Sequence, residues 1–456
     1  MKRAALAALT LLLLVLHGTV SADKPPGYFV DESLLPFEAI PGTSTSRYWG
    51  VHKRAGYRIE VPDAWNGDLV VWAHGFRGTG LELELTAGDP PPGLRLYLVE
   101  NGYAWAASSY SRNDYDVSTG VQDTHALTKR FNGIVSKPNR TYLAGASMGG
   151  HITAVAIEQY PNTYDGAMPV CGAIGDYELF DFFLDFNVAA QQLGTGSSQY
   201  PVDPAAYLFL TLPQIKENLE LFPGGWPLFL NSDGMNLMRL TELRSGGTRT
   251  GFVEAWWFWL SFPEFGSGIP GAFLFELGLG DGTFVRAPGV GIQNSDVVYQ
   301  FDTDPALNPS EQAFNDAVFR LTADPQGRNP NGLSQVPVVN GDIGIPVLTM
   351  HNIGDLFVPI HNEVVYANEV ASNGASDLLV QRAIRGIGHC DFTGAELVTG
   401  FTDLVNWVEN GVKPDGDDLQ DPAQTTDPLF GCDHTQGSHF GGDPLGLPGS
   451  SMLACP

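Results

Sequence analysis

Residues 141–160 read TYLAGASMGGHITAVAIEQY, and this stretch decides the fold. The apolar run TYLA is followed by Gly145-Ala146-Ser147-Met148-Gly149 and then by residues with helical character. The pattern G-x-S-x-G occurs once in the chain; between a strand and a helix it is typical of a sharp turn that exposes a serine hydroxyl. Flanking glycines leave room for a strained backbone at the serine. The stretch therefore predicts a strand, a turn carrying a nucleophilic Ser147, and a helix.

Short apolar runs alternate with helix-like stretches on both sides of this motif. Strands are expected at 68–73, 103–109, 141–144 and 164–170, with helices at 94–101, 123–135 and 148–160. This alternation of apolar runs and helix-like stretches stops near Gly172 and resumes at Ile345. Strands at 346–350 and 378–384 and a helix at 395–410 are expected there. This series predicts an α/β fold, a mostly parallel sheet with helices on both faces.

About 170 residues separate the two parts of the expected sheet, and they are rich in Gly, Pro and aromatic side chains. A long block between two strands is typical of an inserted cap or lid over the mouth of a fold. Most of its aromatic residues are expected in the cap's own core and a minority in a hydrophobic pocket; no substrate-binding residue can be named. The predicted division is core at 23–173 and 345–413, cap at 174–344, and an acidic tail at 414–456.

The N-terminus has the layout of a secretory signal. Lys2 and Arg3 precede an apolar run that ends at Leu16, and small residues lead to a cleavage point after Ala22. No later run reaches the roughly 18 apolar residues of a membrane-spanning helix. The 24 basic and 51 acidic residues give a net charge of -27, which repels phosphate backbones and anionic lipid. We therefore expect an exported, soluble monomer that binds neither nucleic acid nor membrane.

A serine hydroxyl needs a base, and the base needs an orienting acid. Asp355 follows the strand expected at 346–350, and His389 follows the strand expected at 378–384. The carboxyl ends of parallel strands meet at one edge of a sheet, so Ser147, Asp355 and His389 are predicted to converge there. Asp391 is a competing acid, but it lies too close to His389 in sequence to orient the ring easily.

Backbone N–H groups are expected to stabilise a developing oxyanion next to Ser147. Met148 follows the serine, and Phe76 lies in a His-Gly-Phe turn directly after the first expected strand of the parallel series, so these two amides are the predicted donors. His74 in the same turn is a rival base, but its position favours a structural hydrogen bond. The remaining histidines near this edge are expected in packing or at helix ends: His151, His351 and His361.

Four cysteines in an exported chain can pair in three ways. We favour Cys432 with Cys455, which would pin the polar tail, and Cys171 with Cys390, which would tie two loops beside the expected site. A rival hypothesis makes a metal site of Cys432, Asp433, His434 and His439, but no repeated ligand pair supports it. The tail aspartates lack the spacing of an EF-hand. No cofactor and no metal are therefore expected.

Four motifs together resemble the secreted α/β-hydrolases of the carboxylesterase type: HGF at 74–76, GASMGG at 145–150, GDLFVP at 354–359 and GHCDF at 388–392. The resemblance covers 57–171 and 345–413. Exported enzymes of this kind include feruloyl esterases, tannases and hydrolases of aliphatic polyesters. The His-Cys pair at 389–390 is similar to the feruloyl esterase and tannase pattern, in which a cysteine beside the serine bridges to one beside the histidine. Here Ala146 precedes the serine, and Cys171 offers a substitute partner.

The resemblance implies an α/β-hydrolase fold and hydrolysis of a neutral carboxylic ester, small or polymeric, through an acyl-enzyme. The aromatic cap favours a bulky apolar or aromatic acyl group, polyesters included. Two alternatives stay open: an exported serine peptidase of the same fold, and a catalytically silent binding protein. No propeller-like segment precedes the core, which disfavours the peptidase, and the intact Ser147, Asp355 and His389 disfavour the silent protein.

Overall fold

The computed structural model describes residues 27–221, 230–261, 267–283, 289–328, 334–437, 439 and 454–456. The expected signal segment, 1–22, lies outside the described residues. Within those ranges, no helix has the length and apolar character that a membrane crossing requires.

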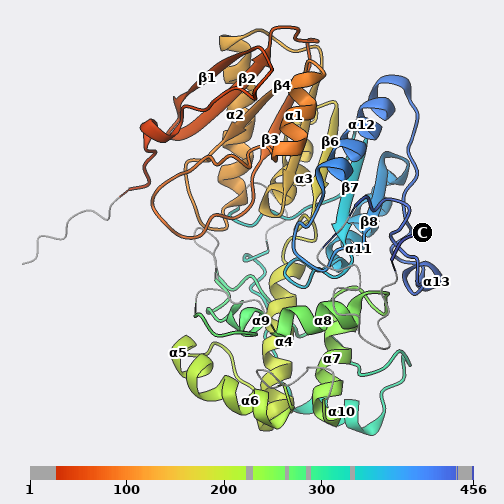
Figure 1. Cartoon of the computed structure of the whole chain (residues 1–456). Helices are drawn as coiled ribbons and strands as arrows, with labels where there is room; N and C mark the ends of the chain where they lie inside the picture. The colour runs from red at the N-terminus through yellow and green to blue at the C-terminus, as the bar shows by residue number, and fades with distance from the viewer. Residues whose placement is uncertain are drawn as a thin grey trace, which may run out of the picture.

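One eight-stranded sheet forms the centre of the fold, in the order β1-β2-β4-β3-β5-β6-β7-β8 (Figure 1). β1 and β2 form an antiparallel hairpin, and β2 runs antiparallel to β4. All neighbours from β4 to β8 are parallel, as the βα series predicts. The strands are β1 (Thr45–His52), β2 (Ala55–Pro62), β3 (Leu69–Ala73), β4 (Ala104–Ser108), β5 (Thr141–Ala146), β6 (Gly166–Val170), β7 (Val347–Asn352) and β8 (Leu379–Ile384).

Helices cover both faces of the sheet. The apolar side chains of β3, β4 and β5 alternate between two cores because successive residues of a strand point to opposite faces. One core is closed by α2 (Val117–Ile134), α3 (Met148–Gln159) and α11 (His361–Ser372). The other is closed by α1 (Pro92–Glu100) and α12 (Gly394–Asn410).

Two helix boundaries show how local residues set the elements. α2 begins at Val117, six residues before the predicted start, because the Asp116 side chain accepts a hydrogen bond from the Thr119 N–H at 3.0 Å. α12 begins with a capping box between Thr393 and Glu396 and ends at Gly411, which adopts a left-handed conformation.

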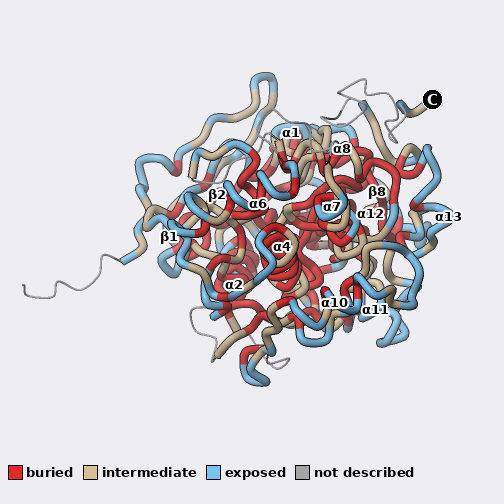
Figure 2. The backbone as a smooth tube through the Cα atoms, turned by 90° about the horizontal axis from the view of Figure 1, so that it is seen from below, coloured by how far each residue is buried: buried red, intermediate tan, exposed pale blue. Residues whose placement is uncertain are grey.

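The segment between β6 and β7, residues 171–346, is here called the helical insertion. It lies below the carboxyl ends of the strands in Figure 1. Its long helix α4 is buried along much of its length (Figure 2). Its apolar core is continuous with residues after β7 and β8, including Leu356, Val358 and Ile387. Its helices are α4 (Glu178–Thr195), α5 (Pro204–Ala206), the π-helix η2 (Tyr207–Thr211), α6 (Leu212–Asn218), α7 (Ser232–Arg244), α8 (Phe252–Ser261), α9 (Phe273–Glu276) and α10 (Pro309–Ala317).

The remaining elements of the described ranges are the short helices η1 (Glu32–Leu34), η3 (Ser376–Leu378) and α13 (Pro422–Thr425). The part of the tail that the structure describes packs along β8 through buried Leu419 and Phe430, and Arg385 donates to the carbonyls of Pro428 and Phe430. A serine turn after β5 in a mostly parallel sheet with helices on both faces is the α/β-hydrolase architecture.

Candidate active site

Ser147 lies in the turn between β5 and α3 with φ 59° and ψ -123°, a conformation that non-glycine residues rarely adopt. The flanking glycines make this turn possible. A Cβ on Gly145 would lie 2.3 Å from the Gly149 carbonyl oxygen, and one on Gly149 would lie 2.0 Å from the Ala73 carbonyl oxygen. The turn therefore packs closely against the end of β3 and presents the serine hydroxyl at the start of α3.

The structure brings the three predicted side chains together. His389 Nε2 lies 2.8 Å from Ser147 Oγ, and His389 Nδ1 lies 2.6 Å from Asp355 Oδ2. Asp355 is fully buried after β7, and His389 is partly exposed after β8. In this geometry the imidazole can accept the serine proton at Nε2 while Nδ1–H donates to the carboxylate.

Backbone N–H groups hold the second oxygen of Asp355. Its Oδ1 accepts from the N–H groups of Phe357 and Val358, both at 2.9 Å. These bonds fix the carboxylate while Oδ2 faces the histidine. Asp391, the competing acid, points elsewhere: its Oδ2 lies 3.7 Å from Nδ1 of His439.

The two predicted oxyanion donors border the serine. Phe76 lines the same cavity as Ser147, and Met148 is the first residue of α3. Gly75, just before Phe76, lies so close that a Cβ there would be 3.1 Å from Ser147 Cβ. Among the described residues, no protein atom accepts a hydrogen bond from the N–H of Phe76 or Met148. Neither N–H is therefore used in a hydrogen bond within the described part of the chain.

An apolar cavity of about 290 Å³ opens at Ser147. Its wall combines residues of the helical insertion with residues of the sheet region, the name used here for residues 27–170 and 347–413. The sequence could not name these lining residues individually. No charged side chain of the described residues lines it. The lining residues are Phe76, Tyr115, Ser147, Ala173, Leu179, Phe180, Phe183, Tyr200, Leu277, Gly278, Gly280, Gly282, Thr283, Ile292, Phe357 and Val358.

Two disulfides are present. Cys171, at the end of β6, is bonded to Cys390, and Cys390 Sγ lies 3.4 Å from His389 Nε2. Cys432 is bonded to Cys455. All four thiols are consumed in these bonds.

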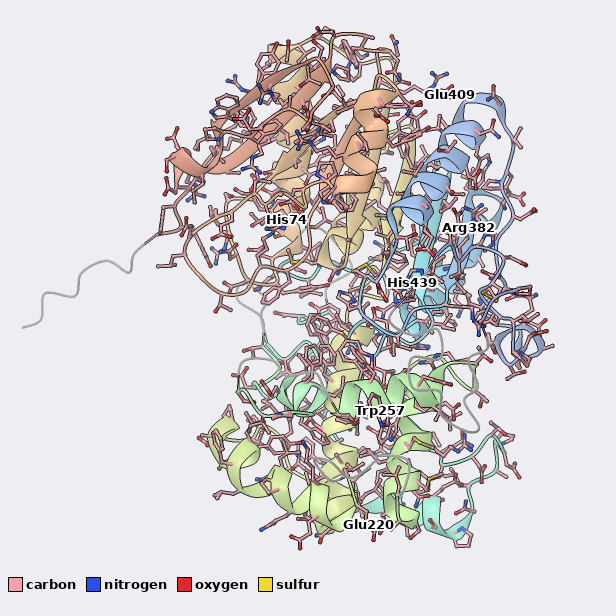
Figure 3. The ribbon with its side chains drawn as sticks, in the orientation of Figure 1. His74, Glu220, Trp257, Arg382, Glu409 and His439 are labelled. Carbon is pink, nitrogen blue, oxygen red and sulfur yellow. A yellow bond between two sulfur atoms is a disulfide. The ribbon has the colours of Figure 1, made fainter. Side chains whose placement is uncertain are left out.

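The residues of the alternative metal hypothesis have separate partners. Cys432 is in a disulfide, His434 Nε2 lies 3.8 Å from Asp417 Oδ2, and His439 Nε2 lies 2.6 Å from Glu396 Oε1. Figure 3 shows His439 near the first turn of α12.

His74 and His151 have structural partners. His74 stacks on Tyr110 with 4.1 Å between ring centroids, and burial lowers its pKa to about 4. His151 donates from Nε2 to the Pro337 carbonyl at 2.8 Å, so Nδ1 accepts from the Tyr115 hydroxyl at 3.0 Å.

Two further histidines contact or begin α11: His351 in β7 and His361. His351 contacts Glu363 and the Val358 carbonyl inside the core, and burial lowers the pKa of His361 at the start of α11 to about 4. Neither contacts Ser147.

Comparison with known proteins places this geometry in context. No family model matches the chain. It is 22% identical over 419 residues to o-phthalyl amidase of Xanthobacter agilis, covering 82% of this chain and 89% of the amidase. Among solved structures, feruloyl esterase B from Aspergillus oryzae is 16% identical over 82% of each chain with a TM-score of 0.42. An esterase from the same organism is 16% identical over 81% of each chain with a TM-score of 0.45.

The fold is that of the α/β-hydrolases, and the similarity to a known amidase along most of both chains supports a hydrolase.

Proposed function

We propose that the protein is a serine hydrolase that cleaves carboxylic esters through an acyl-enzyme. The observation that carries the proposal is the pair of contacts of His389, 2.8 Å to Ser147 and 2.6 Å to Asp355, beside an open apolar cavity. The similarity to a hydrolase over 82% of the chain agrees with it.

The proposed reaction has two halves. Ser147 Oγ attacks the ester carbonyl carbon as His389 Nε2 takes the hydroxyl proton, and the carbonyl oxygen, now negative, accepts from the N–H groups of Phe76 and Met148. Collapse breaks the bond to the alcohol oxygen, which takes the proton from His389. Water then attacks the acyl carbon as His389 takes its proton. Collapse breaks the bond to Ser147 Oγ, which takes the proton back from His389, and the acid leaves. Asp355 holds the imidazole throughout.

The cavity favours a neutral, bulky apolar or aromatic acyl group, because its described lining is almost wholly apolar and carries no charge. Small aromatic esters and aliphatic polyesters both fit this chemistry. In this proposal the helical insertion acts as the cap over the site, and the enzyme works as an exported monomer. The two disulfides suit an oxidising compartment.

Amide hydrolysis is the second candidate, because the relative is named an amidase. A matched pair decides between them: p-nitrophenyl benzoate and benzoyl p-nitroanilide carry the same acyl group on different bonds. We expect Ser147-dependent release of p-nitrophenol with little release of p-nitroaniline. Turnover of the anilide alone would replace the ester proposal with the amide one.

A fluorophosphonate probe tests whether Ser147 is the nucleophile, whichever substrate the protein cleaves. We expect one adduct, located by mass spectrometry at Ser147. Folded protein that takes up no label and cleaves neither substrate would favour the silent binding protein.

A further inference from the structure

Trp259, in α8 of the helical insertion, donates its indole N–H to two backbone carbonyls of the sheet region. Nε1 lies 2.9 Å from the Gly354 oxygen and 3.0 Å from the Ile387 oxygen. Gly354 immediately precedes Asp355, and Ile387 comes two residues before His389. One side chain of the insertion therefore bridges the loop that carries the proposed acid and the loop that carries the proposed base.

These contacts are buried and have no substitute. Trp259 is 4% exposed and Ile387 is 1% exposed. Among the described residues, no other donor reaches the Gly354 or Ile387 carbonyl oxygen. Without the indole N–H, both buried carbonyls would lose their hydrogen bond, which is costly in a dry site.

The two loops also approach each other closely at this point. The Gly354 N–H donates to the Gly386 carbonyl at 2.9 Å, and a Cβ on Gly354 would lie 2.7 Å from the Ile387 side chain. The Trp259 indole contacts both loops at this point from the side of the insertion. A change in its position would alter the separation of the two loops and, through it, the contact of Asp355 with His389.

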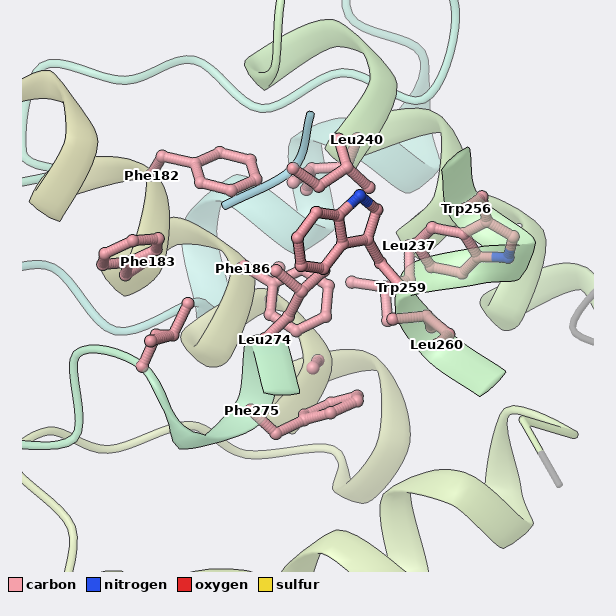
Figure 4. Packing of buried hydrophobic residues seen from close by; sticks show 14 of the residues in the cluster. Phe182, Phe183, Phe186, Leu237, Leu240, Trp256, Trp259, Leu260, Leu274 and Phe275 are labelled. Carbon is pink, nitrogen blue, oxygen red and sulfur yellow. The ribbon is translucent and has the colours of Figure 1, made fainter. Parts of the chain in front are cut away.

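Aromatic packing links the same tryptophan to the histidine ring. The ring of Trp259 lies 5.0 Å from that of Phe273, and Phe273 lies 5.0 Å from Phe357. Phe357 in turn lies 4.9 Å from the His389 ring, edge to face. Figure 4 shows the carbon framework of the Trp259 indole among the labelled phenylalanine and leucine side chains of the insertion core.

We propose that Trp259 is a positioning residue for the hydrolysis reaction: its indole N–H sets the distance between the loops of Asp355 and His389. The inference rests on the proposed function, since it assigns a task to Trp259 only if these two side chains act with Ser147. Trp259 does not line the cavity. Its contribution should therefore appear in the chemical step rather than in substrate binding.

The test is Trp259→Phe, which keeps an aromatic ring and removes the donor. With p-nitrophenyl benzoate we expect kcat to fall about 10-fold, the loss of one shared N–H donor expressed as a rate, with KM within about twofold.

Trp256→Phe is the matched control, a fully buried tryptophan of the same helix that does not donate to Gly354 or Ile387. It should lower Tm about as much as Trp259→Phe does, while kcat and KM stay near wild type. Equal kinetics in the two variants would overturn the positioning role. Absence of Ser147-dependent turnover in the wild type would instead overturn the proposed function.

A second variant covers the case in which Trp259→Phe does not fold. Site-specific incorporation of 3-benzothienylalanine at position 259 keeps the shape of the indole and replaces N–H by sulfur. The same fall in kcat is expected. Wild-type kcat with this residue would contradict the proposal.

Discussion

The sheet region and the helical insertion contribute to one site in different ways. The sheet region supplies the proposed reacting groups, and each lies where a strand ends: Ser147 after β5, Asp355 after β7 and His389 after β8. The insertion supplies cavity wall, such as Phe180 and Phe183, and the indole of Trp259. Strand ends fix the positions of these three side chains through backbone geometry. The insertion shapes the site through packing and single side-chain contacts.

The difference teaches how such a site divides its tasks. Reacting atoms need sub-ångström placement, which rigid strand ends provide. Selectivity for an acyl group needs an adaptable wall, which helices packed over the strand ends provide. Changes in the sheet region should therefore abolish the reaction, and changes in the insertion should alter its rate or its substrate range.

The sharpest way to break this comparison is Ser147→Ala. If Ser147 is the nucleophile, kcat/KM for p-nitrophenyl benzoate should fall by about 10⁴-fold or more, with Tm near wild type since only one partly exposed oxygen is removed. Initial rates and thermal unfolding measured on the same preparation check both parts. Residual activity within tenfold of wild type would remove the serine from the mechanism.

The disulfide joins the two regions, because Cys171 is the first residue of the insertion and Cys390 follows β8 in the sheet region. Replacing both cysteines by alanine should lower the free energy of unfolding by about 2 to 5 kcal/mol. It should also lower kcat, since Cys390 is the direct neighbour of His389. Urea unfolding and ester kinetics measure the two effects.

The matched control is Cys432→Ala with Cys455→Ala, which opens a loop with a sequence separation of 23 rather than 219. It should cost less stability and leave kcat near wild type. A control that loses as much activity as the first pair would show that the effect does not come from the neighbourhood of His389.

Phe180→Ala sharpens the assignment of selectivity to the insertion. Phe180 lines the cavity and packs edge to face on Tyr115 at 5.0 Å. We expect kcat/KM for p-nitrophenyl benzoate to fall about 10- to 100-fold. For p-nitrophenyl acetate, which has a small acyl group, kcat/KM should stay within about threefold of wild type. Phe209→Ala is the control, since Phe209 is 62% exposed and outside the cavity. Equal losses on both esters would argue against an acyl pocket here.

The sequence predicted the parallel strands and the convergence at their carboxyl ends well, because both follow from local patterns. The run TYLAGASMGG holds a strand, a turn and a helix start within ten residues, and its glycines are needed for close backbone approaches. The β1–β2 hairpin escaped prediction. Its turn residues Lys53 and Arg54 adopt positive φ of 50° and 74°, where glycine or asparagine is the usual signal.

The cavity wall and the tryptophan bridge could not be predicted residue by residue. Trp259 stands in the run Trp256-Trp257-Phe258-Trp259, and nothing local separates a donor to two distant carbonyls from its neighbours. The contacts join residues 95 and 128 positions apart. Such contacts arise from tertiary packing, and a single sequence carries no periodicity for them.

The smallest expected effect concerns the tail, which belongs to neither region and is held beside α12. Burial alone lowers the pKa of His439, but Asp391 and Glu396 raise it to about 9. A pKa raised on folding stabilises the protein below the unfolded value of about 6.5, and this stability is lost as pH rises through the folded value. His439→Gln should remove a stabilisation on the order of 1 to 2 kcal/mol at pH 6, since solvent at the partly exposed Asp391 screens the full shift. The difference in unfolding free energy between wild type and variant should then shrink from pH 6.5 to pH 9.

His434→Gln is the control. Burial lowers the pKa of His434 more than Asp417 raises it, so the charge of this imidazole offers no stability in this pH range. A difference for His439→Gln that stays constant across these pH values would mean that the tail is held by packing and not by the charge of the imidazole.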